Sequence, residues 1–148
     1  SFVLVRAAWV LMAVTIMVGA AAALAPERFR LPTLFGFFLI FGWLLTFVAG
    51  ILQRILPFLV SMHAHALERR APRLADMGHA DVTLTTHAVC HAAALALVAG
   101  AIAFDVADLV LAGAVLGGLG AAAFLWFTLE LSWILASMHR NENTADNA

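Results

Sequence analysis

Two histidines lie four positions apart in a largely apolar stretch of the sequence, at His87 and His91. Residues at positions i and i+4 share one face of an α-helix, so both imidazoles would point to the same side. Imidazole is a common metal ligand, and it also titrates near neutral pH. The pair is therefore a candidate for binding a metal ion or haem, or for relaying protons.

The spacing of these histidines favours one kind of metal site over another. A haem takes axial ligands from opposite sides of its ring, hence from different helices, whereas His87 and His91 together suit one compact metal ion. His63 and His65, at the end of the preceding apolar stretch, would add ligands from a second helix. We therefore predict that His87 and His91 ligate a metal, and that His63 joins them in binding a cofactor.

Arg54 and Glu130 are two further ionisable residues inside apolar stretches. A charge within a bilayer is costly, so such residues face the protein interior or pair with each other. Both lie about eight residues from one end of their stretch, which places them in the same layer as His87 and His91. We predict an Arg54–Glu130 pair. The alternative is that both residues lie near the interface and extend their charges into it.

Four long apolar stretches carry these residues. The 148-residue chain is 64% hydrophobic and 11% charged, and its mean hydropathy is +1.00, whereas soluble domains are about 45–50% apolar. A membrane-spanning helix needs about 20 apolar residues, and these runs lack the alternation of strands. We predict one all-α transmembrane domain over residues 1–148, a four-helix bundle with helices at about 2–25, 34–61, 83–104 and 107–138.

The distribution of arginine predicts how the bundle is oriented. The loop over residues 63–81 contains three arginines, and Arg140 follows the last stretch on the same side as Arg6. The first loop, residues 26–33, contains two arginines. Short loops rich in Arg remain in the cytoplasm, so both termini are expected there. The net charge of −1 argues against nucleic acid as a partner, because binding phosphates needs an excess of basic residues.

Small residues recur every four positions in the last stretch, at Gly113, Gly117 and Ala121. This spacing allows helix backbones to approach closely in lipid. It predicts a packing surface, either within the chain or against a partner.

One segment resembles a known group of proteins. Residues 50–60 (GILQRILPFLV), with Gly42 and Trp43 before them and residues 71–77 (APRLADM) after them, resemble a group of bacterial membrane proteins. That group is distantly similar to subunit I of haem–copper oxidases. The resemblance covers about residues 42–103, and it implies a redox-linked complex in the bacterial inner membrane with haem or copper as cofactor.

Two departures limit what this resemblance carries over. The oxidase core has a His-x-His pair inside a helix, whereas His63 and His65 lie at a helix end, and this chain has no tyrosine. Oxygen or nitric oxide reduction is therefore not carried over, and no catalytic residue is assigned.

The expected function follows from these features together. We predict a small multi-pass subunit of a respiratory or oxidase-like complex, which packs in the bilayer against other membrane subunits or further copies of itself. It would contribute His ligands or a proton relay to electron transport. The alternative is a small transporter or channel component, with a polar path at the cytoplasmic side of the bundle.

Overall fold

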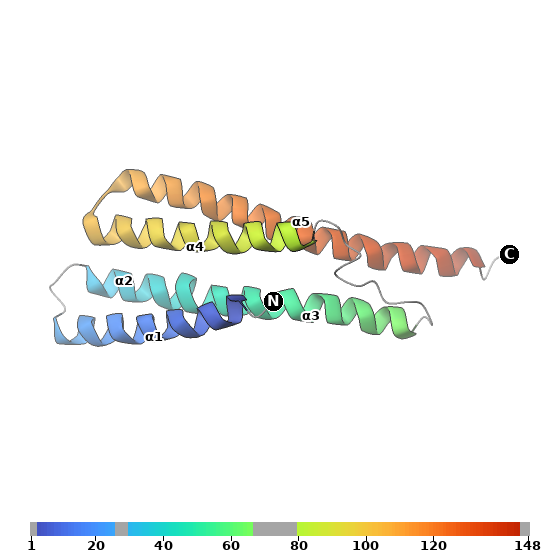
Figure 1. The fold of residues 1–148 in the computed structure, drawn as a ribbon, viewed down its shortest axis with the longest axis horizontal. Coiled ribbons are helices and arrows are strands. Elements are labelled where there is room, and N and C mark those ends of the chain that lie inside the picture. The colour runs from blue at the N-terminus through green and yellow to red at the C-terminus, as the bar shows by residue number, and fades with distance from the viewer. Residues whose placement is uncertain (1–2, 26–29, 67–79, 146–148) are drawn as a thin grey trace.

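Helices make up nearly all of the described chain. The computed structural model describes residues 3–25, 30–66 and 80–145, with side chains left out at 63–66, 135 and 138–145. No strand occurs within these ranges. The elements, in chain order, are α1 (Val3–Leu24), α2 (Leu31–Phe37), the π-helix η1 (Phe38–Leu44), α3 (Leu45–Ala66), α4 (Ala80–Phe104) and α5 (Ala107–Ala145) (Figure 1).

Four helical segments are long and apolar enough to cross a membrane: α1, the continuous run α2–η1–α3, α4, and α5 up to Ile134. This confirms the predicted all-α membrane bundle. The loop on which the predicted orientation depends falls largely within residues 67–79, outside the described ranges. The cytoplasmic location of the termini therefore stays a prediction.

Four predicted helix boundaries differ from the structure by three residues or more, and one of them is the end of the second segment, at Ala66 rather than residue 61. The second segment begins at Leu31 rather than residue 34, because Pro32 lies in its first turn, where a missing N–H needs no partner. The third begins at Ala80 rather than residue 83, and the fourth continues to Ala145 rather than ending at 138. Hydropathy located the apolar part of each helix, but polar residues extend the helices beyond it.

The four segments are arranged as two helical hairpins. One hairpin consists of α1 packed against α2, η1 and α3, and the other of α4 packed against α5 (Figure 1). The two hairpins contact each other mainly through α3 with α5 and α2 with α4. Because contacts within each hairpin are more extensive than those between them, the space between the hairpins can hold a cavity.

Glycines bring α4 and α5 close together. A Cβ atom added to Gly113 would lie 2.6 Å from Val98 Cγ2, and one added to Gly120 would lie 3.1 Å from Cys90 Cβ. Gly117 also faces α4, with Ala94 Cβ at 3.6 Å from the same construction. The packing predicted for Gly113 and Gly117 is therefore made within the chain, and Gly120 extends it by one further turn.

The two hairpins are joined near both ends of the apolar part of the bundle. At one end, the side chains of Val60, Ala80, Phe127 and Leu131 form a buried hydrophobic cluster between α3, α4 and α5. At the other, the Arg30 guanidinium makes two contacts of 2.7 Å with the Asp105 carboxylate. The hairpins are thus held together on either side of the central region.

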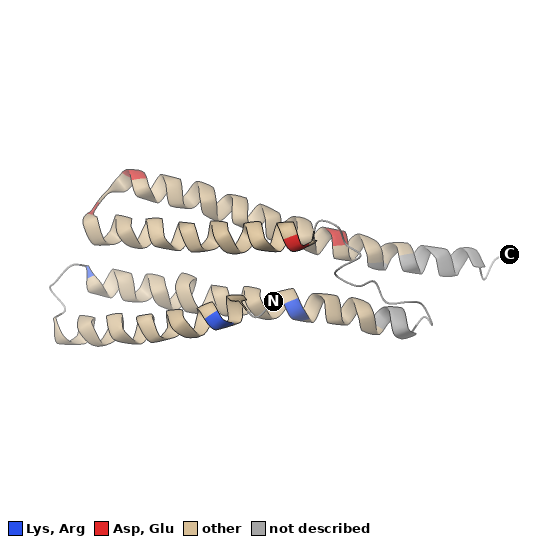
Figure 2. Ribbon diagram, in the orientation of Figure 1, with Lys and Arg blue, Asp and Glu red and all other residues tan. Residues whose placement is uncertain are grey.

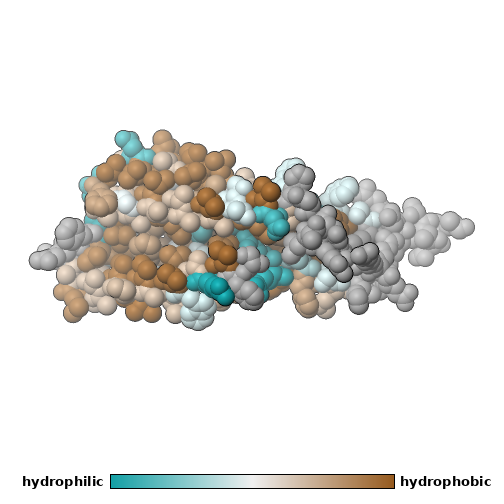
Figure 3. All heavy atoms as spheres, in the orientation of Figure 1, coloured by the Kyte–Doolittle hydropathy of each residue, from teal (hydrophilic) through white to brown (hydrophobic). Residues whose placement is uncertain are grey.

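Charged residues of the described part lie mainly at two levels along the bundle, although the charged residue of α1 lies between them (Figure 2). Asp81 in α4 and Asp105, which directly follows α4, mark these levels, and the 24 residues of α-helix from Asp81 to Phe104 correspond to about 36 Å. The hydrocarbon core of a bilayer is about 30 Å thick. On the face drawn in Figure 3, the surface of the helix pairs is mostly apolar, with hydrophilic residues towards its two ends. We therefore place the two charged levels at the two membrane interfaces.

Candidate functional site

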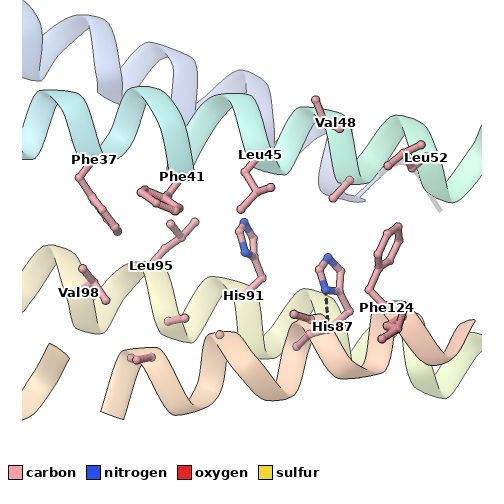
Figure 4. A pocket seen from close by; sticks show the side chains of 18 of the residues that line it. Phe37, Phe41, Leu45, Val48, Leu52, His87, His91, Leu95, Val98 and Phe124 are labelled. Atoms are coloured by element: carbon pink, nitrogen blue, oxygen red, sulfur yellow. Dashed lines mark hydrogen bonds between the residues drawn. The ribbon is translucent and has the colours of Figure 1, made fainter. Parts of the chain in front are cut away.

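A cavity of about 690 Å³ lies between the two hairpins, in the part of the bundle that we place in the bilayer. Figure 4 shows its side chains: Phe37, Phe41 and Leu45 project from one hairpin, and Leu95 and Phe124 from the other. Nearly all of its lining is apolar. The two imidazoles of α4 and the hydroxyl-bearing Thr128 are the exceptions among the described lining residues.

His87 is buried, with 7% of its surface exposed, and it is held by its neighbouring helix. Its Nδ1 lies 3.0 Å from the backbone oxygen of Gly120, an atom that can only accept a hydrogen bond. Nδ1 must therefore carry a proton, which makes Nε2 the acceptor nitrogen of the neutral ring. Nε2 is buried and has no hydrogen-bond partner in the described part of the chain.

This arrangement is the one that prepares a histidine to bind a metal centre. A metal-bound histidine typically donates its other ring N–H to a carbonyl or carboxylate, which fixes both the tautomer and the orientation of the ring. The Gly120 carbonyl supplies that contact, and the ring of Phe124 lies beside His87, with centroids 5.0 Å apart. His87 therefore presents an oriented lone pair without another protein partner.

His91 has a different environment from His87, although the two rings stack with centroids 5.7 Å apart and planes 17° from parallel. Its Nε2 is 2.7 Å from the hydroxyl oxygen of Thr46 on α3. Thr46 is only 1% exposed, so this hydrogen bond joins the two hairpins inside the bundle. To ligate a metal through Nε2, His91 would first have to release Thr46.

A compact metal ion finds few ligands here. Across residues 3–25, 30–66 and 80–145, no group of three or more His, Cys, Asp or Glu side chains could hold a metal ion. His63 lies in α3, but its side chain is outside the described part, so its predicted contribution is not placed. Cys90 packs near Gly120 at the α4–α5 contact.

The structure does not bring Arg54 and Glu130 together. Arg54 is exposed and lines a hollow with Gln53 and Asp81 on the side of α3 and α4. Glu130 lines a separate hollow on α5, and its Oε2 has no hydrogen-bond partner among the described residues. The predicted pair is not formed within the described ranges, because the two side chains face different surfaces of the bundle.

Both charges instead lie near the charged level that we place at a membrane interface, and Arg54 lines its hollow together with Asp81 of that level. Glu130 follows Asp108 by 22 residues of continuous helix, or about 33 Å, close to the thickness of the apolar layer. The alternative that placed both residues near the interface fits this level. His87 and His91 are the ionisable side chains that line the cavity within the described ranges, and Thr46 bonds to His91.

The π-helical segment is a feature of the site that sequence reasoning missed. At its end, the N–H of Leu45 bonds to the carbonyl of Ile40, five residues earlier. Phe41 lies in η1, and Phe37 and Leu45 flank it, and all three line the cavity. Single π-turns inside α-helices are frequent at functional sites. The apolar run through this segment carries no pattern that distinguishes a π-turn from an α-helix.

Chemically, the site combines an apolar volume, aromatic walls and one oriented imidazole nitrogen. It can hold a large lipophilic group that bears either a metal atom or a hydrogen-bond donor. Comparisons of this chain with protein-family models, with curated proteins and with solved structures found no match.

Proposed function

We propose that this chain is a small integral membrane subunit of a respiratory or oxidase-like redox complex, and that the cavity between its hairpins would hold a haem bound through His87. One observation carries the proposal. The Nε2 atom of His87 is buried without a partner, while Nδ1 is anchored on the Gly120 carbonyl. The resemblance of residues 42–103 to proteins distantly similar to haem–copper oxidases is consistent with it.

Haem fits these residues better than a copper ion does. A protein-bound metal ion needs several side chains converging on one point, whereas a haem brings four nitrogen ligands of its own and needs an axial one. The apolar cavity, with Phe37, Phe41 and Phe124 in its walls, suits the face of a flat lipophilic ring. When bound, a haem would supply one-electron transfer.

The protein's own contribution would come from three contacts around the cavity. The Gly120 carbonyl would fix the His87 ring and raise its basicity as a ligand. The Thr46–His91 hydrogen bond would hold α3 against α4, and the apolar lining would exclude water. His91 is thus a positioning residue rather than a ligand in this proposal, unlike the paired role predicted from its spacing.

The alternative of a transporter or channel has less support. A path for ions or protons needs polar groups or water across the apolar layer. Beyond His91, towards the end marked by Arg30, the described cavity lining consists of residues such as Phe37, Leu95 and Val98. These side chains offer nothing to hydrate an ion, so we favour a site that holds a bound lipophilic group.

The direct test is replacement of His87 by glycine. Haem binding to the purified protein, followed through the Soret band, is expected for the wild type and for His91→Ala, and its loss is expected for His87→Gly. Adding free imidazole should restore the band of His87→Gly, because the small ligand can occupy the space left by the side chain.

The controls make this test decisive. His91→Ala removes the neighbouring imidazole of the same helix face while leaving the His87–Gly120 contact in place. Circular dichroism of each variant shows whether the helices still form. If haem binds His87→Gly as tightly as the wild type, without an imidazole effect, the proposed axial role of His87 is refuted.

A further inference from the structure

A second hollow lies on α5, away from the cavity between the hairpins. We propose that it binds the ammonium headgroup of a membrane lipid, through the Glu130 carboxylate and the indole rings of Trp126 and Trp133. The hollow has a volume of about 510 Å³, and these three residues and Leu129 line it. It shares no described lining residue with the proposed haem cavity.

The helix places the three polar and aromatic side chains together. Positions 126, 130 and 133 are spaced by four and three residues, so they form one stripe along a single face of α5. Trp126 is 63% exposed and Trp133 is 69% exposed, whereas Glu130 is half-buried between them. Two exposed tryptophan side chains therefore flank the Glu130 carboxylate.

Among the described residues, the Glu130 carboxylate has no cationic partner. Its Oε2 atom is buried and has no hydrogen-bond partner within the described ranges. The hydroxyl of the nearby Ser132 donates to the Thr128 carbonyl of the same helix instead. An anion that is partly removed from water is stabilised by a nearby positive charge.

The chemistry of the hollow selects an ammonium group. A cation positioned over an indole face is attracted by the negative charge of the ring's π-system, and Trp is the strongest aromatic partner for it. An adjacent carboxylate adds direct charge attraction and accepts hydrogen bonds from N–H groups. A glycerol headgroup gains neither of these interactions, because it carries no positive charge.

The depth of Glu130 identifies a lipid as the source of that ammonium group. The residue lies about 33 Å of helix from Asp108, at the level of the charged band that we place at the interface (Figure 2). Tryptophan side chains typically lie at this headgroup level. The hollow opens on the outer face of the bundle, where lipid is the neighbour that the bilayer itself supplies.

Competition between two lipids tests the proposal. The full chain is placed in nanodiscs of phosphatidylethanolamine and phosphatidylglycerol with identical acyl chains, and the lipids that remain bound are counted by native mass spectrometry. Wild type is expected to retain the ethanolamine lipid about fivefold above its bulk proportion, as one cation–π contact would give. Glu130→Gln should bring retention back to the bulk ratio.

Asp81→Asn is the matched control, since it neutralises a carboxylate at the same level but outside the hollow. It should keep the enrichment, whereas Trp126→Leu and Trp133→Leu should each reduce it with unchanged helicity. Equal enrichment in Glu130→Gln and wild type would overturn the proposal. So would a change in self-association of Glu130→Gln without a change in lipid retention, which would assign the carboxylate to a contact between copies.

Discussion

An alanine at position 120 should force α4 and α5 apart at the level of His87. The added methyl group would lie 3.1 Å from Cys90 Cβ, 3.4 Å from the His87 carbonyl oxygen and 3.5 Å from the His91 nitrogen. Only the Cys90 contact is tighter than ordinary van der Waals distance, and because Cβ is fixed to the backbone, relief requires the helices to shift apart by a few tenths of an ångström. Extra carbon atoms in a well-packed interior typically cost about 1–3 kcal/mol.

Gly118→Ala provides the matched comparison on the same helix. A Cβ atom at Gly118 meets nothing within 4 Å, so alanine there should leave stability unchanged or raise it by up to about 1 kcal/mol through helix propensity. The free energy of unfolding can be measured by titrating SDS into the protein in mild micelles, with tryptophan fluorescence as the signal. We expect Gly120→Ala to be less stable than Gly118→Ala by about 1–3 kcal/mol, because the gain in helix propensity is common to both variants and only the overpacking differs.

The Gly120 variant has a second expected effect, because the Gly120 carbonyl accepts the hydrogen bond from His87 Nδ1. Separating the helices should lengthen that contact and weaken haem binding as well as stability. If Gly120→Ala and Gly118→Ala have the same free energy of unfolding, the close approach of α4 and α5 at this turn is refuted.

Two other contacts between the hairpins give further predictions. Asp105→Asn removes the ion pair with Arg30 but keeps a residue that tolerates the positive φ of 60° at this position. The free energy of unfolding is expected to fall by at most about 1 kcal/mol, and this loss should vanish in about 1 M salt. A loss that persists at high salt would contradict an electrostatic origin. Thr46→Val removes the hydrogen bond to His91 and should lower the same free energy by about 0.6 kcal/mol, the average for such bonds between membrane helices. Thr15→Val serves as its control, since the Thr15 hydroxyl bonds to the Leu11 carbonyl within its own helix; equal losses in the two variants would show that the Thr46 bond between hairpins adds nothing.

The helices were predictable because a bilayer leaves the backbone few choices. Long apolar runs without alternation can only be helices or parts of a closed barrel, and hydropathy alone located all four spans. The lengths of α3 and α5 were underestimated at their polar ends. Hydropathy detects only the apolar part of a helix, so it does not show that the helix continues into polar residues. The π-turn of η1 was not predicted either, because the apolar residues on both sides of Gly42 are equally compatible with a regular α-helix.

The candidate site was predictable in part. The spacing of His87 and His91 correctly placed both imidazoles on one face, and the structure stacks them. Their different partners depend on the other hairpin and on α5: Thr46 lies 45 residues from His91, and Gly120 lies 33 residues from His87. The spacing of residues within one helix contains no information on contacts with other helices. The prediction from spacing therefore gave both imidazoles the same role, that of a metal ligand.

The position of the charges decides which residues belong to the interior site. The sequence prediction counted residues from the near end of each apolar run, and it placed Arg54 and Glu130 inside the bilayer. The apolar runs of α3 and α5 continue beyond the interface, so this count overestimated the depth of both residues. Counting from the charged residues at the opposite end places Glu130 about 33 Å away, beyond an apolar layer of about 30 Å. Arg54 and Glu130 line separate hollows at this level, so neither side chain depends on the other. The unpaired Nε2 of His87 has no such access to headgroups or water, and a bound group in the cavity is what would satisfy it.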